Sequence, residues 1–184
     1  MLTRDAIIEA GLGILDAYGL GDLSMRRVAD ALGVQAGALY YHVPNKQSLL
    51  AALADEVLAG VRLPAEREPA AWLTAWSDGL RAALLARRDG AELVASSLAL
   101  GLGGVGLTDP AERVLVAAGN PRPGATARAL LHLILGHCVT EQTRAQLRDL
   151  GVIAAFDAER ASADFAWAVA TFVRGALEVS AAKS

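Results

Sequence analysis

Residues 24–46 read S-M-R-R-V-A-D-A-L-G-V-Q-A-G-A-L-Y-Y-H-V-P-N-K, and this stretch decides the fold of the chain. Two short helical patterns are separated by Gly33, which can adopt a positive φ without a Cβ clash. The first helix begins after Ser24, a good N-cap residue, and the small Ala29 lets the second helix cross closely. Pro44 then ends the second helix. The pattern predicts a helix-turn-helix.

Two segments of this region resemble a known family. A-D-A-L-G-V at 29–34 and A-L-Y-Y-H-V-P-N-K-Q-S-L-L at 38–50 resemble the DNA-binding domain of TetR-family transcriptional regulators. The second segment is similar to the tetracycline-repressor branch in particular. The resemblance is dense from about Thr3 to Leu58 and then thins to fragments, R-R-D-G-A at 87–91 and C-V-T-E at 138–141.

The remaining sequence predicts an all-α protein, because no useful length of β-type alternation occurs. The boundary is expected near Pro64 and the charged segment E-R-E-P at 66–69. We therefore expect a three-helix DNA-binding domain at 1–61, with its helix-turn-helix at about 24–43, and a helical ligand-binding and dimerisation domain at 65–184. The long late helices, at about 123–150 and 161–182, are apolar on more than one face. The resemblance implies that they pack as a four-helix bundle in a homodimer; a monomeric helical core is the alternative.

Composition limits the classes of protein to which the chain can belong. It has 184 residues, 54% of them hydrophobic, and a formal net charge of −3. The longest charge-free run, 93–108, is short for a membrane span and contains four glycines. The N-terminus lacks the pattern of a signal peptide, so a cytoplasmic protein without membrane contact is expected. Cys138 is the only cysteine, which excludes an intrachain disulfide.

The negative net charge of the chain does not favour general binding to nucleic acids, but the helix-turn-helix has a local positive patch. Within 24–46, Arg26, Arg27 and Lys46 oppose only Asp30. Affinity that depends on phosphate contacts is therefore expected to be modest.

The second helix of a helix-turn-helix presents its N-terminal residues to the base edges, and here these are Gln35, Ala36, Gly37 and Ala38. Gln35 can read adenine or cap the helix, whereas the alanines offer only methyl contacts to thymine. The resemblance implies operator contacts at Arg26, Ala36, Gly37, Ala38, Tyr40, Tyr41, His42 and Lys46. Arg26 can donate two hydrogen bonds to guanine, and the aromatic and basic residues would hold phosphates. The alternatives are a core aromatic at Tyr40 or Tyr41, a helix C-cap at His42 and solvated charges at Arg26 and Arg27.

A second group of polar residues lies on a late helix. His137 and Glu141 are four residues apart, a spacing that fits a hydrogen-bonded pair, a dimer-interface pair or two metal ligands. Two ligands do not make a metal site, and no HExxH-type motif accompanies them, so no metal or other cofactor is expected.

The resemblance also bears on the effector. Tetracycline repressors hold a magnesium–drug complex with a histidine on an earlier helix and a glutamate that matches Glu141. Here Val94 stands at the histidine position, and Trp76 replaces an asparagine that grips the drug. We therefore expect a more apolar, aromatic or polyketide-like effector that contacts Trp72, Trp76, Val94, Ser97, His137 and Glu141. The alternative is that both tryptophans are ordinary core residues.

These observations predict a ligand-responsive repressor of TetR type, a homodimer released from palindromic double-stranded operator DNA by a small molecule. No nucleophile elbow, phosphate-binding loop or paired carboxylates indicate an enzyme, and the glycine-rich segment 101–106 is expected to be a loop. One alternative is a helical small-molecule-binding or enzymatic protein with a vestigial helix-turn-helix. A pure dimerisation module is a third interpretation, but it leaves residues 24–46 unexplained.

Overall fold

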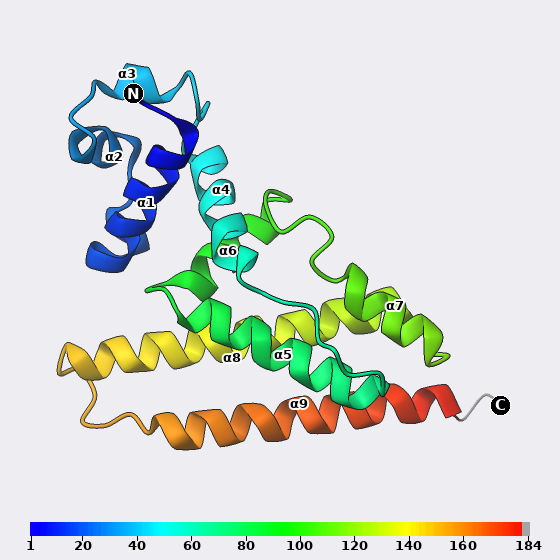
Figure 1. Ribbon diagram of the computed structural model, residues 1–184. Helices are drawn as coiled ribbons and strands as arrows, with labels where there is room; N and C mark the ends of the chain where they lie inside the picture. Colours follow the sequence, from blue (N-terminus) through cyan, green and yellow to red (C-terminus); the bar gives the residue numbers. More distant parts are fainter. Residues whose placement is uncertain (182–184) are drawn as a thin grey trace. The chain divides into compact units, whose positions relative to one another are not determined.

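The computed structural model describes residues 1–181, and helices joined by turns and loops make up this range (Figure 1). No strand occurs among these residues, which confirms the all-α prediction. A short 3-10 turn, η1 (Leu20–Asp22), follows the first helix. The described α-helices are α1 (Arg4–Tyr18), α2 (Met25–Ala31), α3 (Ala36–Leu39), α4 (Lys46–Ala59), α5 (Pro69–Leu85), α6 (Gly90–Ala99), α7 (Asp109–Ala117), α8 (Pro123–Asp149) and α9 (Ala158–Ala181). The predicted end of the last helix, Ala182, lies outside the described residues.

The chain divides into two compact units, which are described separately. The first unit comprises residues 1–60 and 83–105, and the second comprises 61–82 and the chain from 106 onward. Helix α6 and the glycine-rich segment thus belong with the N-terminal helices, and α5 runs from the second unit into the first. The functional division into a DNA-binding and a ligand-binding domain stays a prediction.

Three helix caps are present in the first unit, including the one predicted at Ser24. Side-chain oxygens of Thr3, Ser24 and Asn45 each accept the backbone N–H of the third residue after them, at 3.1, 3.2 and 2.8 Å respectively. Each cap satisfies a donor that a helix start leaves without an intrahelical partner and contributes about 1 kcal/mol. The local sequence therefore sets where α1, α2 and α4 begin.

The helix-turn-helix is built from α2 and α3. Gly33 has a φ of 66°, so the turn uses the left-handed conformation that glycine permits. Ala29 and Leu39 are buried where the two helices pack. Helix α3 is α-helical over only four residues, and the chain continues in turns through Tyr41 and His42. The predicted motif is confirmed, with a shorter second helix.

Asp89 has a residue type that suits a helix N-cap, but it makes a different contact. It stands at the N-cap position of α6, but its side chain forms no capping hydrogen bond there. Its carboxylate instead accepts the backbone N–H of Leu20 at 2.7 Å, and so joins the α5–α6 turn to η1 within the first unit. Because Leu20 is 69 residues away in sequence, this interaction had no local signature.

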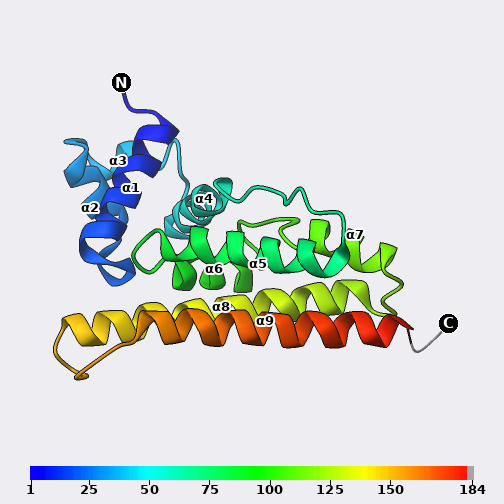
Figure 2. The same cartoon turned by 60° about the horizontal axis from the view of Figure 1, so that its bottom comes forward.

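In the second unit, α8 and α9 lie side by side along most of their length (Figures 1 and 2). Their contact buries Phe165 and Val169 of α9 and Ile134 of α8. Helix α7 packs against α8. The Asn120 amide donates a hydrogen bond to the carbonyl of Ala176 at 2.7 Å, which ties the α7–α8 turn to α9. No described helix has both the length and the hydropathy needed to span a membrane.

Candidate functional site

The residues predicted to face DNA lie on the surface of the first unit. Arg26, on α2, is exposed, and so is Lys46 at the start of α4. Tyr40 and Tyr41 are 49% and 90% exposed, so neither is a core aromatic. The remaining positions are exposed at Gln35, Gly37 and Ala38 and half-buried at Ala36 and His42. All the predicted DNA-contacting residues are therefore at least partly exposed to solvent.

The two adjacent arginines of α2 have different environments. The Arg27 guanidinium forms an ion pair with Asp22 at 2.5 Å and lies 3.9 Å from the centre of the Tyr18 ring. Arg26 has no ion pair among the described residues and extends into solvent. Arg27 thus holds α2 against η1 and α1, whereas Arg26 keeps its donors for an external acceptor.

The side chains around α3 divide into two chemical kinds. At its beginning, Ala36, Gly37 and Ala38 leave little bulk between the backbone and an approaching base edge. Beyond its end, Tyr41 and His42 meet edge to face with their ring centres 5.3 Å apart. Hydroxyl, imidazole and ammonium donors of this kind suit phosphate oxygens, whereas an arginine such as Arg26 suits guanine.

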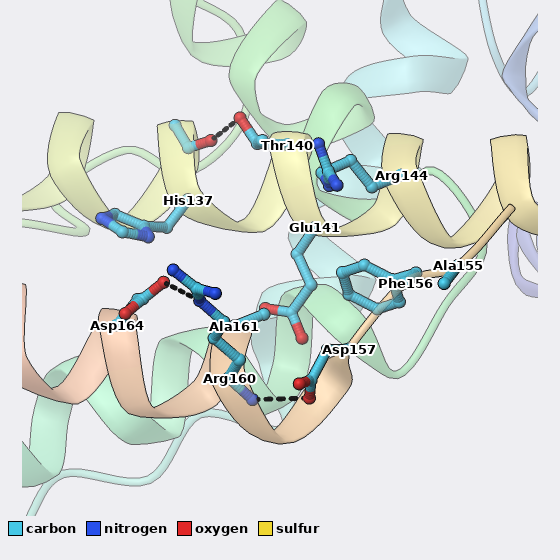
Figure 3. Close-up of a pocket in the computed structure, with 11 residues that line it drawn as sticks. His137, Thr140, Glu141, Arg144, Ala155, Phe156, Asp157, Arg160, Ala161 and Asp164 are labelled. Carbon is cyan, nitrogen blue, oxygen red and sulfur yellow. Dashed lines mark hydrogen bonds and ion pairs between the residues drawn. The ribbon is translucent and has the colours of Figure 1, made fainter. Parts of the chain in front are cut away.

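The second unit contains an open cavity of about 720 Å³ between α8 and the start of α9 (Figure 3). Two predicted ligand residues, His137 and Glu141, line it from α8. The other ionisable side chains of its wall are Arg144, Asp157, Arg160 and Asp164. This wall is more polar than the apolar surroundings expected for the effector.

Glu141 is held by an arginine that the sequence did not indicate. Arg81 of α5 donates from Nη2 to both carboxylate oxygens, at 2.7 and 2.9 Å, and from Nε to Oε2 at 3.2 Å. Both side chains are largely buried, 19% and 13% exposed. A bidentate guanidinium–carboxylate pair of this kind is strong and directional. The carboxylate is therefore already neutralised by a cation of the chain itself.

An aromatic and thiol environment surrounds this pair. The Arg81 guanidinium lies 5.2 Å from the Phe165 ring centre, and His137 meets the same ring edge to face at 5.7 Å. Burial raises the pKa of the Cys138 thiol to about 12; the nearby Arg81 charge opposes this rise and the Glu141 charge adds to it. Cys138 is thus an uncharged core residue at neutral pH.

The other predicted ligand residues are buried. Trp72 and Trp76 stack on one another in α5 with ring centres 6.3 Å apart, and neither belongs to the wall of the cavity. Val94 and Ser97 lie on α6 in the first unit. The Ser97 hydroxyl is the only buried side-chain polar atom among the described residues without a hydrogen-bond partner. The effector role of these four residues stays a prediction.

Comparisons with known proteins identify the family. The family model for bacterial regulatory proteins of the tetR family matches residues 7–53. Tetracycline repressor protein class G from Vibrio anguillarum is 34% identical over 147 residues, which cover 77% of this chain and 70% of that protein. The chain belongs to the TetR family. The class D tetracycline repressor from Escherichia coli is 41% identical over 96 residues, covering 50% of this chain but only 44% of that repressor, so the match spans less than half of its length.

Solved structures extend the likeness over nearly the whole TetR-family chain. BioQ from Mycobacterium smegmatis superposes with a TM-score of 0.90 at 34% identity, covering 97% of this chain and 99% of BioQ. A structure of BioQ with its natural double-stranded DNA operator has a TM-score of 0.75 at 35% identity and covers 90% of this chain and 99% of that one. ActR from Streptomyces coelicolor in complex with (S)-DNPA has a TM-score of 0.81 at 27% identity and covers 98% and 99%.

Two features of this TetR-family chain escaped the sequence analysis. The first is Arg81, which lies 60 residues before Glu141 and has no distinguishing pattern around it. The second is the pairing of Arg27 with Asp22, five residues earlier, which a search for local charge pairs would have found. No cluster of three or more metal-binding side chains occurs within residues 1–181.

Proposed function

We propose that the chain is a DNA-binding transcriptional repressor that acts as a homodimer and leaves its operator when a small molecule binds. The observation that carries the proposal is the exposed helix-turn-helix face, on which Arg26 has no ion pair with any described residue while its neighbour Arg27 pairs with Asp22. The likeness to operator-bound BioQ supports the same use of this face.

On this proposal, α3 enters the major groove with Gln35, Ala36, Gly37 and Ala38 toward the bases. Arg26 reads a guanine through two hydrogen bonds, and Tyr40, Tyr41, His42 and Lys46 hold phosphates and fix the register. A dimer would set two such faces about 35 Å apart on a palindrome. Because the base-reading positions of α3 carry mostly methyl groups, DNA shape contributes to the selection of the operator.

The surface of α9 supports a dimer. Trp167 is 72% exposed, and the exposed small residues Ala163, Ala166 and Ala170 lie on the same side of the helix at spacings of three and four. A large aromatic side chain surrounded by alanines favours close packing against another helix. We propose that α8 and α9 form a four-helix bundle with the same helices of a second copy.

The effector is proposed to be a small molecule bound without a metal. Because Arg81 already occupies both oxygens of Glu141, a divalent ion would have to displace a bidentate guanidinium from this carboxylate. The cavity beside His137 and Glu141 has room for a drug-sized ligand. The likeness to ActR with bound (S)-DNPA supports a ligand-responsive regulator. The proposed apolar or aromatic character of the effector rests on Trp72 and Trp76, which are buried and do not line this cavity.

We propose no catalytic role for the chain and expect it to act in the cytoplasm, where bacterial DNA lies. The alternative, a small-molecule-binding or enzymatic protein with an inactive helix-turn-helix, predicts that the exposed face has no selective affinity for any DNA. The two functions therefore differ in one measurable property.

The decisive experiment measures binding to the DNA upstream of the protein's own gene, by fluorescence anisotropy at two salt concentrations. Wild type should bind this DNA more tightly than a scrambled duplex, and Arg26→Ala should remove most of the difference. Arg113→Ala, which removes an exposed arginine of α7, is the matched control and should leave the preference unchanged. Equal affinity of wild type for both duplexes would falsify the repressor function.

A further inference from the structure

Three consecutive residues of the α5–α6 turn hold the C-terminal end of α1. Asp89 accepts the N–H of Leu20 at 2.7 Å, and Arg88 donates from Nη1 to the Ala17 carbonyl at 3.2 Å. Arg87 forms an ion pair with Asp16 at 2.5 Å. We name residues 87–89 the clamp turn. The bond from Arg88 satisfies a carbonyl near the C-terminal end of α1, and the bond to Asp89 satisfies the N–H at the first position of η1.

The local backbone is shaped for this contact. Asp89 has a φ of 54°, the only positive φ among the described non-glycine residues. Asp and Asn adopt this left-handed conformation more readily than other residues with a Cβ, and surrounding contacts hold it here. Gly19, with a φ of 86°, makes room on the other side, because a Cβ there would lie 2.7 Å from Asp89 Oδ2. The turn is therefore held in place by its contact with α1 and η1.

The contact continues from η1 to α2. Asp89 fixes the first residue of η1, Leu20, and Asp22 at the end of η1 pairs with Arg27 of α2. Tyr18, the last residue of α1, lies against the same Arg27 guanidinium. Arg26 directly precedes this anchored residue. A continuous series of contacts thus joins the clamp turn to the arginine that is proposed to read a base.

We propose that Asp89 is a positioning residue for operator recognition, which sets the position of Arg26 through η1 and the Asp22–Arg27 pair. The inference rests on the proposed DNA-binding function and adds a route of regulation to it. Helix α5 ends at Leu85, two residues before the clamp turn, so the proposal predicts that a shift at this end of α5 would reach α2 through Asp89.

The test separates positioning from folding by the choice of substitution. Asp89→Gly removes the acceptor for the Leu20 N–H while tolerating the positive φ, so the turn keeps its backbone conformation. Asp89→Asn keeps an acceptor oxygen and the left-handed preference. Glu68→Ala, which removes an exposed carboxylate that accepts the N–H groups of Ala70 and Ala71, is the matched control in the second unit.

Binding of the upstream duplex and of a scrambled duplex is measured for each variant, alone and combined with Arg26→Ala. Asp89→Gly should weaken specific binding about tenfold, a factor within the usual range of coupling between sites, and leave scrambled-duplex binding unchanged. In the Arg26→Ala background the same substitution should change affinity less than about twofold. Asp89→Asn and Glu68→Ala should bind like wild type.

Two results overturn the inference: an unchanged affinity of Asp89→Gly, or an equal loss with and without Arg26. If Asp89→Gly loses helicity, the cycle is repeated with Leu20→Pro, which removes the donor at the first position of η1, where proline is tolerated. If wild type binds both duplexes equally, the proposed DNA-binding function itself is rejected. If wild type prefers the upstream duplex but the effects of Asp89→Gly and Arg26→Ala are additive, only the role of Asp89 is rejected.

Discussion

The helix-turn-helix face and the cavity beside α8 are built in opposite ways. Every proposed DNA contact lies within residues 26–46, and the caps and turn that place them come from residues 24–46. The central interaction beside the cavity joins Arg81 to Glu141, residues 60 positions apart on different helices. The helix starts and the turn of the first surface are set by local sequence, and Asp89 is the one distant residue proposed to adjust it. The second surface instead depends on packing between distant segments. A substitution should therefore affect mainly DNA binding in one region and mainly stability in the other.

The largest expected effect tests the non-local region. Arg81→Ala leaves the largely buried Glu141 carboxylate without its partner and should lower the free energy of unfolding by about 2–4 kcal/mol. Urea unfolding followed by circular dichroism measures the change. The double variant Arg81→Ala/Glu141→Ala should be more stable than the single one, because no unpaired charge remains. A single variant as stable as wild type contradicts the assigned strength of this pair.

The next effect tests the local region. Arg26→Ala should weaken operator binding by about 1–3 kcal/mol and relax the preference for guanine at one position of each half-site. The free energy of unfolding should stay unchanged, because Arg26 is exposed and forms no ion pair within residues 1–181. Binding to operators with each base at that position gives the specificity. A uniform loss across all four bases would instead identify Arg26 as a phosphate contact.

A smaller effect is expected at the boundary between the helix-turn-helix and α4. Asn45→Ala removes the acceptor of the Ser48 N–H and should lower the free energy of unfolding by about 1 kcal/mol. Asn45→Asp should retain the cap, because its carboxylate also accepts this N–H and favours a helix N-terminus. Equal stability of the alanine and aspartate variants would show that solvent replaces the cap.

The smallest effect concerns pH. Backbone N–H groups of Ala70 and Ala71 lower the pKa of Glu68 below its ordinary value of 4.5. Since the folded pKa is the lower one, the ionised carboxylate stabilises the fold above about pH 4.5, and this contribution is lost as pH falls through the folded pKa. Melting temperatures measured between pH 5 and pH 3 should fall less steeply for Glu68→Gln than for wild type. The exposed position makes the change small.

Local chemistry explains which features were predictable. Ser24, Gly33 and Asn45 determine helix starts and a turn through their own side chains or φ, and all three behave as their sequence context indicates. Asp89 had the right residue type for a helix cap, but a donor 69 residues away competes for its carboxylate. Sequence patterns describe neighbours along the chain, so Asp89 and Arg81 acquire their roles only when separate helices pack together.

The single cysteine has a practical consequence. Cys138 is fully buried, and its pKa of about 12 leaves roughly one thiolate per hundred thousand molecules at pH 7. Oxidants and maleimides react with the thiolate, so the native Cys138 thiol should react with them only very slowly. A cysteine placed at an exposed position near α3 would then take up a fluorophore selectively. Operator binding and release can thus be followed by single-site labelling without first removing the native residue.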